Sequence, residues 1–248
     1  MDNYWTDLEW EGQKIYLPIY TKLFRKVEQK FVEVIERLGF EECLFTKLPT
    51  TSQSAVLRKA LPRLAKEWSK EIVDAKNVTS NPKYPATYNL CHWQCEPFYF
   101  FLQKEKPNHQ VRFYDKSGWS YRIEPDINDF RLFEFQRIEI VWFAEQIIAQ
   151  SIQSILIEEL QSLLKFLGIE TEIERKTDEE LLSKEKVVLD LTTHIQDVGV
   201  VELVGSHLHG RLFIESLDMD VDSNYYTGCC GIGLNRIVNA LIKKGISL

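Results

Sequence analysis

The chain has 248 residues, of which 44% are hydrophobic and 27% charged, and these fractions exclude a disordered, collagen-like or disulfide-rich protein. Its 37 acidic and 30 basic residues give a formal net charge of −7, which argues against capture of nucleic acid over a broad basic surface. No apolar run reaches the length of a membrane span and the N-terminus lacks a signal-peptide pattern, so a cytoplasmic protein with no membrane partner is expected.

The first predicted element is an amphipathic helix over Thr21–Leu38, where apolar residues recur every three or four positions and Gly39 follows as a helix end. A helical insertion is expected around residues 52–80. The stretch Asn77–Ala86 contains two prolines that interrupt any periodic pattern, and it is therefore predicted to be a loop.

The second half of the chain alternates strands with two further helices. Short β-rich runs predict strands at Trp119–Glu124, Glu134–Phe143, Lys186–Thr192, Gly199–Gly205 and Arg211–Leu217. Apolar periodicity predicts helices at about Phe143–Leu167 and Leu234–Lys244. Because short polar loops join neighbouring strands, the sequence favours one α+β domain over residues 1–248, with an antiparallel β-sheet flanked by helices.

Two of the predicted strands carry charged residues on one face. A period of two places Arg122 and Glu124 together, and it likewise places Phe135, Arg137 and Glu139 on one side of the next strand. An antiparallel pair would bring these side chains onto a common floor. Alternation alone is equally compatible with a solvated sheet face that carries incidental ion pairs.

The order of these residues resembles a known family. Arg122-Ile123-Glu124, a loop, and then Arg131, Phe135 and Glu139 resemble motif 2 of class II aminoacyl-tRNA synthetases. The segment from Gly231 to Arg236 resembles their motif 3, and the first helix followed by Pro49 resembles motif 1. The resemblance implies a class II synthetase-like catalytic core that binds ATP and a small amino acid.

The resemblance also implies roles for the motif 2 residues. Arg122 would hold the α-phosphate of ATP and the substrate carboxylate, for which a planar guanidinium is suited. Glu124 would face the adenine amino group, Arg131 would meet the γ-phosphate, and Phe135 would stack under adenine. Stacking of a base on an aromatic ring contributes roughly 1–3 kcal/mol in nucleic-acid complexes.

In motif 3, the resemblance implies that Arg236 covers the other face of adenine and approaches the γ-phosphate. Gly233 would let the backbone pass close to the nucleotide. The glycines alone would fit an ordinary strand-to-helix turn, but such a turn gives no reason for Arg236. Arg122, Glu124 and Arg236 are thus the implied catalytic residues.

Glu202 matches the magnesium-binding glutamate of the seryl-type enzymes, and Mg²⁺ would bridge the phosphates of ATP. The family has a serine three positions later, where this chain has Gly205. The sequence leaves open whether Ser206 completes the magnesium site.

Five cysteines in a chain of this length indicate reduced thiols or metal ligands. Cys95, Glu139 and Cys229 match the zinc ligands of the bacterial amino acid:[carrier protein] ligases, which are related to methanogenic seryl-tRNA synthetases. Two thiolates and a carboxylate would leave one position on Zn²⁺ for the substrate amino group. Cys91 and Cys230 are then expected to be packing residues.

Two histidines near motif 3 are left without a settled role. His207 and His209 alternate on a strand or loop and could face the amino acid pocket or serve as a ligand. Polar residues at the end of a strand are the simpler interpretation.

The expected function is ATP-dependent formation of an aminoacyl-adenylate and transfer to the phosphopantetheine thiol of a carrier protein. The chain has no room for a tRNA-binding domain next to the predicted core, so tRNA is not expected as a partner. Basic residues that could meet an acidic carrier protein are Arg58, Lys59, Arg63, Lys66 and Lys70.

Two alternatives remain. One is a truncated aminoacyl-tRNA synthetase paralogue acting on tRNA or another nucleophile, and the other is a non-catalytic regulatory paralogue. Because motif 1 forms the subunit interface in this family, the resemblance also implies a homodimer.

Overall fold

The structure is a computed structural model that describes residues 4–7, 14–47, 74–75, 88–89, 93–121, 127–176 and 187–246. The predicted insertion around 52–80 lies outside the described residues apart from β4 (Asp74–Ala75), which pairs with β5 (Tyr88–Asn89). Other predictions that lie outside the described residues concern Pro49, the loop Asn77–Ala86, Cys91, Arg122, Glu124 and the basic residues between 58 and 70.

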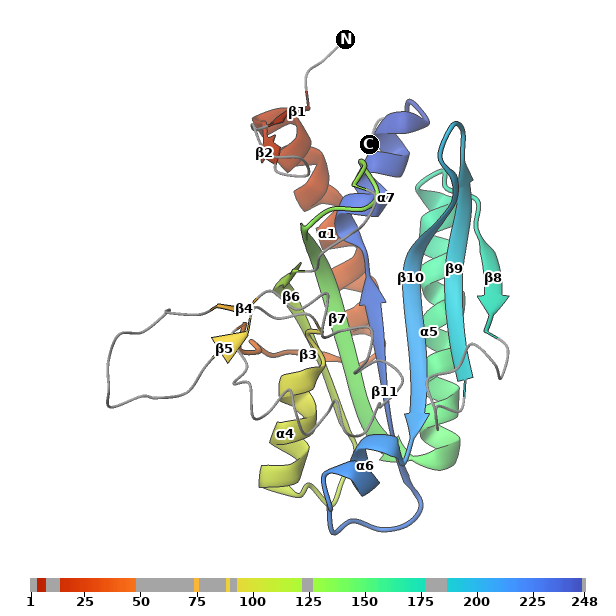
Figure 1. The fold of residues 1–248 in the computed structure, drawn as a ribbon. Helices are drawn as coiled ribbons and strands as arrows, with labels where there is room; N and C mark the ends of the chain where they lie inside the picture. The colour runs from red at the N-terminus through yellow and green to blue at the C-terminus, as the bar shows by residue number, and fades with distance from the viewer. Residues whose placement is uncertain are drawn as a thin grey trace.

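A seven-stranded sheet forms the centre of the described part of the chain (Figure 1). In sheet order its strands are β3 (Glu41–Glu42), β6 (Val111–Tyr121), β7 (Glu134–Glu145), β11 (Tyr225–Ile232), β10 (Gly199–Gly210), β9 (Val187–Ile195) and β8 (Glu172–Arg175). Only the short pair β3 and β6 is parallel within this sheet. The predicted α+β class with an antiparallel sheet is confirmed.

Helices cover both faces of the sheet. The long helices α1 (Pro18–Arg37), α5 (Gln146–Phe166) and α7 (Leu234–Lys243) pack behind it in Figure 1, whereas α4 (Glu96–Glu105) and α6 (Leu212–Ser216) lie at its lower front. A hairpin of β1 (Trp5–Asp7) and β2 (Lys14–Tyr16) precedes α1. None of the described helices combines the length and apolar character that crossing a membrane requires.

The alternation of side chains along β7 divides the core in two. Ile138, Ile140 and Trp142 belong to the cluster beneath α1, α5 and α7, whereas Val141 and Phe143 belong to the cluster beneath α4 and α6. Arg137 and Glu139 have the same parity as Val141 and therefore lie on the α4 side. One face of β7 is thus polar in its first half and apolar in its second half.

The structure differs from the sequence-based prediction at two element boundaries and in the type of one element. The first helix begins at Pro18, three residues earlier than predicted, because proline is suited to the first helical turn. The strand β7 continues to Glu145 before α5 begins. The strand predicted at Arg211–Leu217 is wrong, since these residues form α6.

The error at α6 has a local cause. Leu212, Phe213 and Ile214 have high β-propensity, but all three are buried in succession, which an alternating half-buried strand does not allow. Gly210, with a φ of +60°, ends β10 immediately before them. The Ser216 hydroxyl donates to the Leu212 carbonyl within the short helix.

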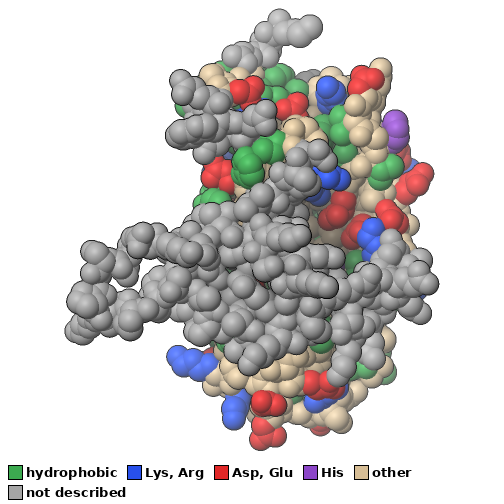
Figure 2. Space-filling model, viewed as in Figure 1, with side chains coloured by type: hydrophobic (Ala, Val, Ile, Leu, Met, Phe, Trp, Pro, Cys, Tyr) green, Lys and Arg blue, Asp and Glu red, His purple; other side chains and the backbone are tan. Residues whose placement is uncertain are grey.

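The described part of the surface in Figure 2 carries acidic and basic side chains interspersed with one another. Some of these charges form surface ion pairs, such as Lys116 with Glu42 and Lys176 with Glu174. Exposed pairs of this kind add little to stability.

Candidate active site

Three sequence-distant residues converge in front of the sheet. Ligand atoms of Cys95, Glu139 and Cys229 lie within 4.8 Å of one another, and all three side chains are buried. Cys95 is the N-cap of α4, Glu139 lies on β7 and Cys229 lies on β11.

The choice between the adjacent cysteines on β11 follows from strand geometry. Cys229 belongs to the α4 side of the sheet, whereas Cys230 is packed in the core with α5 and α7. In the ladder between β11 and β7, Cys229 pairs with Val141, which lies on the α4 side of the sheet. Cys230 pairs with Ile140, which lies on the opposite side, in the core with α5 and α7. Cys230 therefore cannot reach the cluster without a shift of the strand register.

Burial opposes ionisation of Glu139 and Cys229 when no cation is near. The pKa of Glu139 is raised by burial, an effect that Arg137 and His207 partly offset. The Arg137 guanidinium lies 2.9 Å from Glu139 Oε2. The pKa of Cys229 is raised well above its ordinary value by its interaction with Cys95 and by burial.

The donor set fits a zinc ion. Two sulfurs and one carboxylate oxygen are typical Zn²⁺ ligands, and three protein ligands leave a fourth position for an exchangeable group. Buried anionic groups are unfavourable unless they are paired or coordinate a metal. The raised pKa values and the spacing of the ligand atoms are both consistent with a site that a divalent cation would stabilise.

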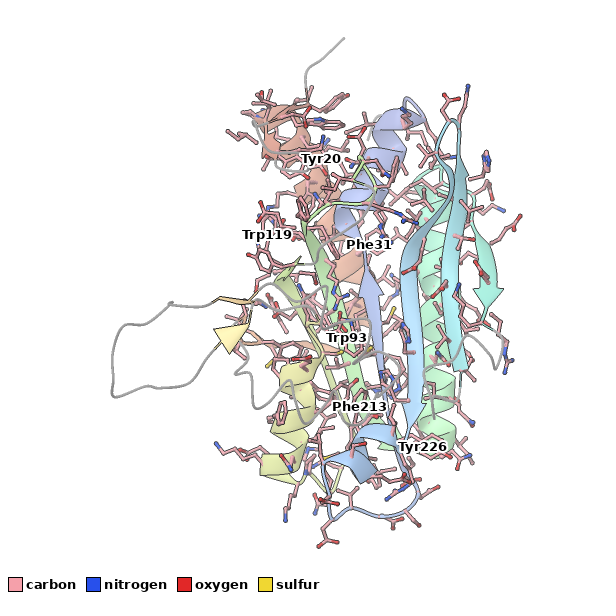
Figure 3. The ribbon with its side chains drawn as sticks, in the orientation of Figure 1. Tyr20, Phe31, Trp93, Trp119, Phe213 and Tyr226 are labelled. Carbon is pink, nitrogen blue, oxygen red and sulfur yellow. The ribbon has the colours of Figure 1, made fainter. Side chains whose placement is uncertain are left out.

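The cluster opens into a cavity of about 140 Å³. Trp93, which precedes α4, and Phe213 of α6 line its wall, and both are labelled in Figure 3. The floor residues include Gly205, His207 and Gly231 of the sheet. A cavity of this size beside the cluster can hold a small molecule and excludes a bulky side chain.

A second, more open cleft of about 490 Å³ lies next to this cavity. Its wall includes Arg131, Asp190, Glu202 and Arg236. Glu202 lines both the small cavity and the open cleft, so it stands where the two meet. Among the described residues, neither wall includes Phe135, which is half-buried opposite Ser120.

Backbone carbonyls fix the side chain of Arg236. Its Nε donates to the Phe130 carbonyl at 2.9 Å, and its Nη1 donates to the Glu202 carbonyl at 2.9 Å. Gly233 precedes α7, and a Cβ at this position would lie only 3.3 Å from the Leu203 carbonyl oxygen. A guanidinium held in this way is directed toward the cleft before any substrate is present.

The structure does not favour Ser206 as the residue that completes a magnesium site with Glu202. Ser206 points away from the cleft: it is fully buried, its neighbours Val204 and Leu208 belong to the core beneath α5, and it pairs across the ladder with the core residue Cys230. A bulge between Glu202 and Val204 places Glu202 on the same face as Gly205. The sequence pattern alone gave no sign of this bulge.

Asp190 is a carboxylate that sequence reasoning did not single out. A Cβ at Gly205 would lie 3.0 Å from Glu202 Oε1 and 3.3 Å from Asp190 Oδ1, so the two acids approach one point. Burial and the Glu202 charge raise the pKa of Asp190 to about 6, and Lys176, 3.2 Å away, opposes this rise. The alternation of β9 was the available signal, because it places Asp190 on the same side as its buried polar neighbour Thr192.

We expect the Asp190 carboxylate to make folding stability depend on pH. Its pKa is about 6 in the folded protein, whereas 3.8 is the ordinary value and applies to the unfolded chain. Between these two pH values the folded state therefore binds more protons than the unfolded state. The free energy of unfolding should therefore fall as pH rises from 4 to 6, by roughly 1–3 kcal/mol from this group after allowance for solvent screening. Urea unfolding of the wild type and of Asp190→Asn at several pH values measures this effect.

The Asp190→Asn variant should lack that part of the pH dependence, whereas Glu158→Gln, at an exposed position of α5, should retain it. An identical pH slope in the wild type and Asp190→Asn would contradict the assignment.

The structure therefore brings together most of the described site residues that the sequence predicted. Cys95, Glu139 and Cys229 form one group, and Arg131, Glu202 and Arg236 line one cleft. Sequence reasoning gave no role to Trp93 or Phe213, whose place in the cavity depends on how α4 and α6 dock on the sheet.

No protein-family model matches the chain. Curated sequences do match it. The type-2 serine–tRNA ligase of Methanothermobacter thermautotrophicus is 32% identical over 276 residues, which cover 94% of this chain and 53% of that protein. The ligase of the same name from Methanocaldococcus jannaschii is 29% identical, over 95% of this chain and 53% of its own length. The chain spans about half the length of these relatives.

Solved structures share the fold. M. kandleri SerRS, in a crystal structure with A. aeolicus tRNASec, superposes with a TM-score of 0.80 at 23% identity, covering 98% of this chain and 56% of that one. Prolyl-tRNA synthetase from Cryptosporidium parvum superposes with a TM-score of 0.83 at 15% identity, covering 97% and 49%. At these identities the similarity establishes the fold.

The comparisons contradict two expectations about partners, namely that tRNA is excluded and that a carrier protein is the acceptor. The matched curated relatives are named as serine–tRNA ligases, and one similar structure was solved with tRNA bound. The net charge misled because it is an average over the whole chain and does not describe the surface at which an acceptor would enter. Chain length was no guide to the acceptor, since the matched relatives are about twice as long as the part they share with this chain.

Proposed function

We propose that this chain, which has the catalytic core of a class II aminoacyl-tRNA synthetase, uses ATP to activate a small amino acid and supplies it to tRNA. The observation that carries the proposal is the adjacency of two cavities. The buried Cys95–Glu139–Cys229 group lines the small one, and Arg131 and Arg236 line the open one. One suits an amino acid and the other suits a polyanionic nucleotide.

Activation requires an amino acid carboxylate and the α-phosphate of ATP to meet in line. The carboxylate oxygen attacks phosphorus, the bond to the bridging oxygen of pyrophosphate breaks, and an aminoacyl-adenylate forms. No protein nucleophile is needed, since positioning and charge stabilisation lower the barrier. The place where the two cavities meet, beside Glu202, is where the reacting groups would come together.

Arginines would stabilise the negative charge of the transition state. Arg236 is held by backbone carbonyls and lines the open cleft together with Arg131. We assign Arg122 and Glu124 to the α-phosphate and to adenine from the sequence motif alone. Phe135 keeps its assignment as the residue beneath adenine on the same basis.

Two metal ions have candidate ligands. Cys95, Glu139 and Cys229 would hold Zn²⁺, which supplies a Lewis-acid position for a substrate amine. Glu202 and Asp190 would hold Mg²⁺ with ATP, because Mg²⁺ is usually bound by one or two carboxylates together with substrate phosphates. A cation between these acids would also relieve their mutual repulsion.

The amino acid is proposed to be small, with serine as the first candidate. The cavity of about 140 Å³ limits the side chain, and the imidazoles of His207 and His209 provide polar atoms in its wall. The matched curated relatives are serine–tRNA ligases, which supports both serine and a tRNA acceptor.

We expect serine, more than any other amino acid, to support exchange of pyrophosphate into ATP by the purified chain. Glycine, alanine and threonine test the size limit, and phenylalanine should support much less exchange than serine, because its ring would have to share a cavity of about 140 Å³ with its own amino and carboxylate groups. Exchange needs only the adenylate step, so it reports activation independently of the acceptor.

A second assay then offers tRNA or a phosphopantetheinylated carrier protein to the preformed adenylate. Transfer to tRNA supports the proposed acceptor. Exchange without transfer to tRNA, or transfer to the carrier protein, would contradict the acceptor while leaving activation in place. Absence of exchange with every amino acid would contradict activation itself and favour a non-catalytic paralogue.

A homodimer is also proposed, through α1. A groove runs beside this helix, and the Phe166 side chain in it is 79% exposed in the single chain. Its lining combines apolar side chains with charged ones, namely Tyr16, Pro18, Phe166 and Leu167 with Lys22, Arg25, Lys26, Lys30 and Glu33. A symmetric interface would bury such a surface against its own copy. We expect sedimentation at micromolar concentration to give the mass of two chains, and Phe166→Glu to shift it toward one chain; a wild-type monomer would contradict the proposal.

A further inference from the structure

Two buried polar side chains lie directly behind the sulfurs of the Cys95–Glu139–Cys229 group. The first is His209 on β10, whose Nε2 lies 3.4 Å from Cys229 Sγ. This side chain is only 5% exposed. The distance fits a hydrogen bond from a ring N–H to sulfur.

The second is Tyr99 on α4. Its side chain is fully buried, and its hydroxyl has no hydrogen-bond partner of good geometry among the described residues. Tyr99 lies four residues after Cys95, the N-cap of α4, so one helical turn places the two side chains on the same face of the helix. A buried hydroxyl without a partner is costly, so its position calls for an acceptor.

Aromatic packing fixes both side chains. Tyr99 stacks on Phe213 with ring centroids 3.9 Å apart, and His209 meets the same phenyl ring edge-on at 4.8 Å. Tyr99 and His209 also meet edge-on, at 5.9 Å. The three rings therefore fix a buried hydroxyl one helical turn from Cys95 and an imidazole nitrogen 3.4 Å from Cys229 Sγ (Phe213 is labelled in Figure 3).

His209 does not belong to the ligand group itself. The ligand atoms of Cys95, Glu139 and Cys229 all lie within 4.8 Å of one another, and within the described ranges no histidine nitrogen joins them. His209 approaches Cys229 from its own strand, β10, which pairs with β11. It is placed to act on the sulfur and not on a cation.

We infer that Tyr99 and His209 are positioning residues for a bound divalent metal, donating hydrogen bonds to the sulfurs of Cys95 and Cys229 respectively. The inference rests on the proposed metal site. Two thiolates and a carboxylate carry more negative charge than Zn²⁺ neutralises, and donors to the sulfurs offset the excess. Partners of this kind orient metal ligands, and their loss typically weakens metal binding 10–100-fold.

Tyr99→Phe and His209→Phe test the inference, because each keeps a ring in the aromatic packing and removes the polar atoms. We expect each variant to bind Zn²⁺ 10–100-fold more weakly in a competition with a chromogenic chelator. In the Co²⁺-substituted protein, the sulfur-to-cobalt charge-transfer band should move to longer wavelength, because sulfur that has lost a hydrogen bond is a stronger electron donor. A change in packing alone would not produce this shift.

Matched controls separate the donors from general effects. Tyr225→Phe removes a hydroxyl that donates to the Asn108 carbonyl, and His194→Gln removes an exposed imidazole; both should leave zinc affinity and the cobalt band unchanged. His209→Gln retains an N–H donor and should recover part of the affinity and of the band position. Thermal melting of each apo-protein establishes that it is folded.

The outcomes distinguish this inference from the proposed metal site. If the wild type binds zinc and Co²⁺, and Tyr99→Phe and His209→Phe match the controls in affinity and spectrum, the two residues have no positioning role. If the wild type itself binds neither metal, the metal site fails and this inference fails with it, whereas serine-dependent exchange could still support amino acid activation.

Discussion

Replacement of Cys95 or Cys229 by serine is expected to abolish zinc binding and to lower amino acid-dependent pyrophosphate exchange at least 100-fold. Each change removes one of three buried protein ligands, and the remaining thiolate and carboxylate cannot hold the ion in a tetrahedral arrangement. The amino acid would then lose the contact that holds its amino group, so that its carboxylate is no longer positioned for attack. Elemental analysis and exchange on the same preparation measure both effects.

Cys230→Ala and Cys43→Ala are the matched controls. Cys230 lies on the other face of β11 within the core, and Cys43 is a half-exposed thiol beside β3. Both variants should retain zinc and exchange, with some loss of stability for Cys230→Ala because it leaves a small gap in the core. Loss of zinc in either control, with retention in Cys95→Ser, would mean that the ligand set is wrong.

Arg236→Ala is expected to lower the rate of adenylate formation by about 10²–10³, which corresponds to about 2.7–4 kcal/mol of transition-state stabilisation. The guanidinium is held in the cleft by the carbonyls of Phe130 and Glu202 before substrate arrives, so its charge is available without reorganisation. Steady-state exchange at saturating ATP and amino acid measures the effect.

Arg236→Lys keeps the charge but cannot contact both carbonyls in the same way, and it should recover only part of the rate. Lys243→Ala, at an exposed position of the same helix, should have no effect on exchange. Wild-type exchange by a folded Arg236→Ala protein would contradict the assignment of the cleft to ATP.

The sheet and its long helices could be predicted because their patterns are regular. The alternation in β7 correctly placed Arg137 and Glu139 on one face, and the periodicity of α1 and α5 gave both helices within a few residues. Short elements were harder: α6 was taken for a strand, since it contains Phe213 and Ile214 and its five residues are too few to show a helical period.

The sequence likewise predicted only some of the residues of the candidate site. The family resemblance selected Cys95, Glu139 and Cys229, but it could not tell that a bulge after Glu202 would place that residue on the face of Gly205, or that Asp190 of β9 would meet it there. Nor could it place Tyr99 or Phe213, because their positions result from the docking of α4 against α6. Local patterns predict elements, whereas contacts between elements depend on packing that one sequence does not display.

The three residues of the metal group come from widely separated parts of the chain, and one of them, Cys95, is the N-cap of α4. A cation bound there would act as a cross-link that joins α4 to the two central strands β7 and β11. Because ordered ligands exist only in the folded state, such a link would shift the folding equilibrium toward the native form by mass action. Binding of the cation and attachment of the α4 layer to the sheet would then be thermodynamically coupled.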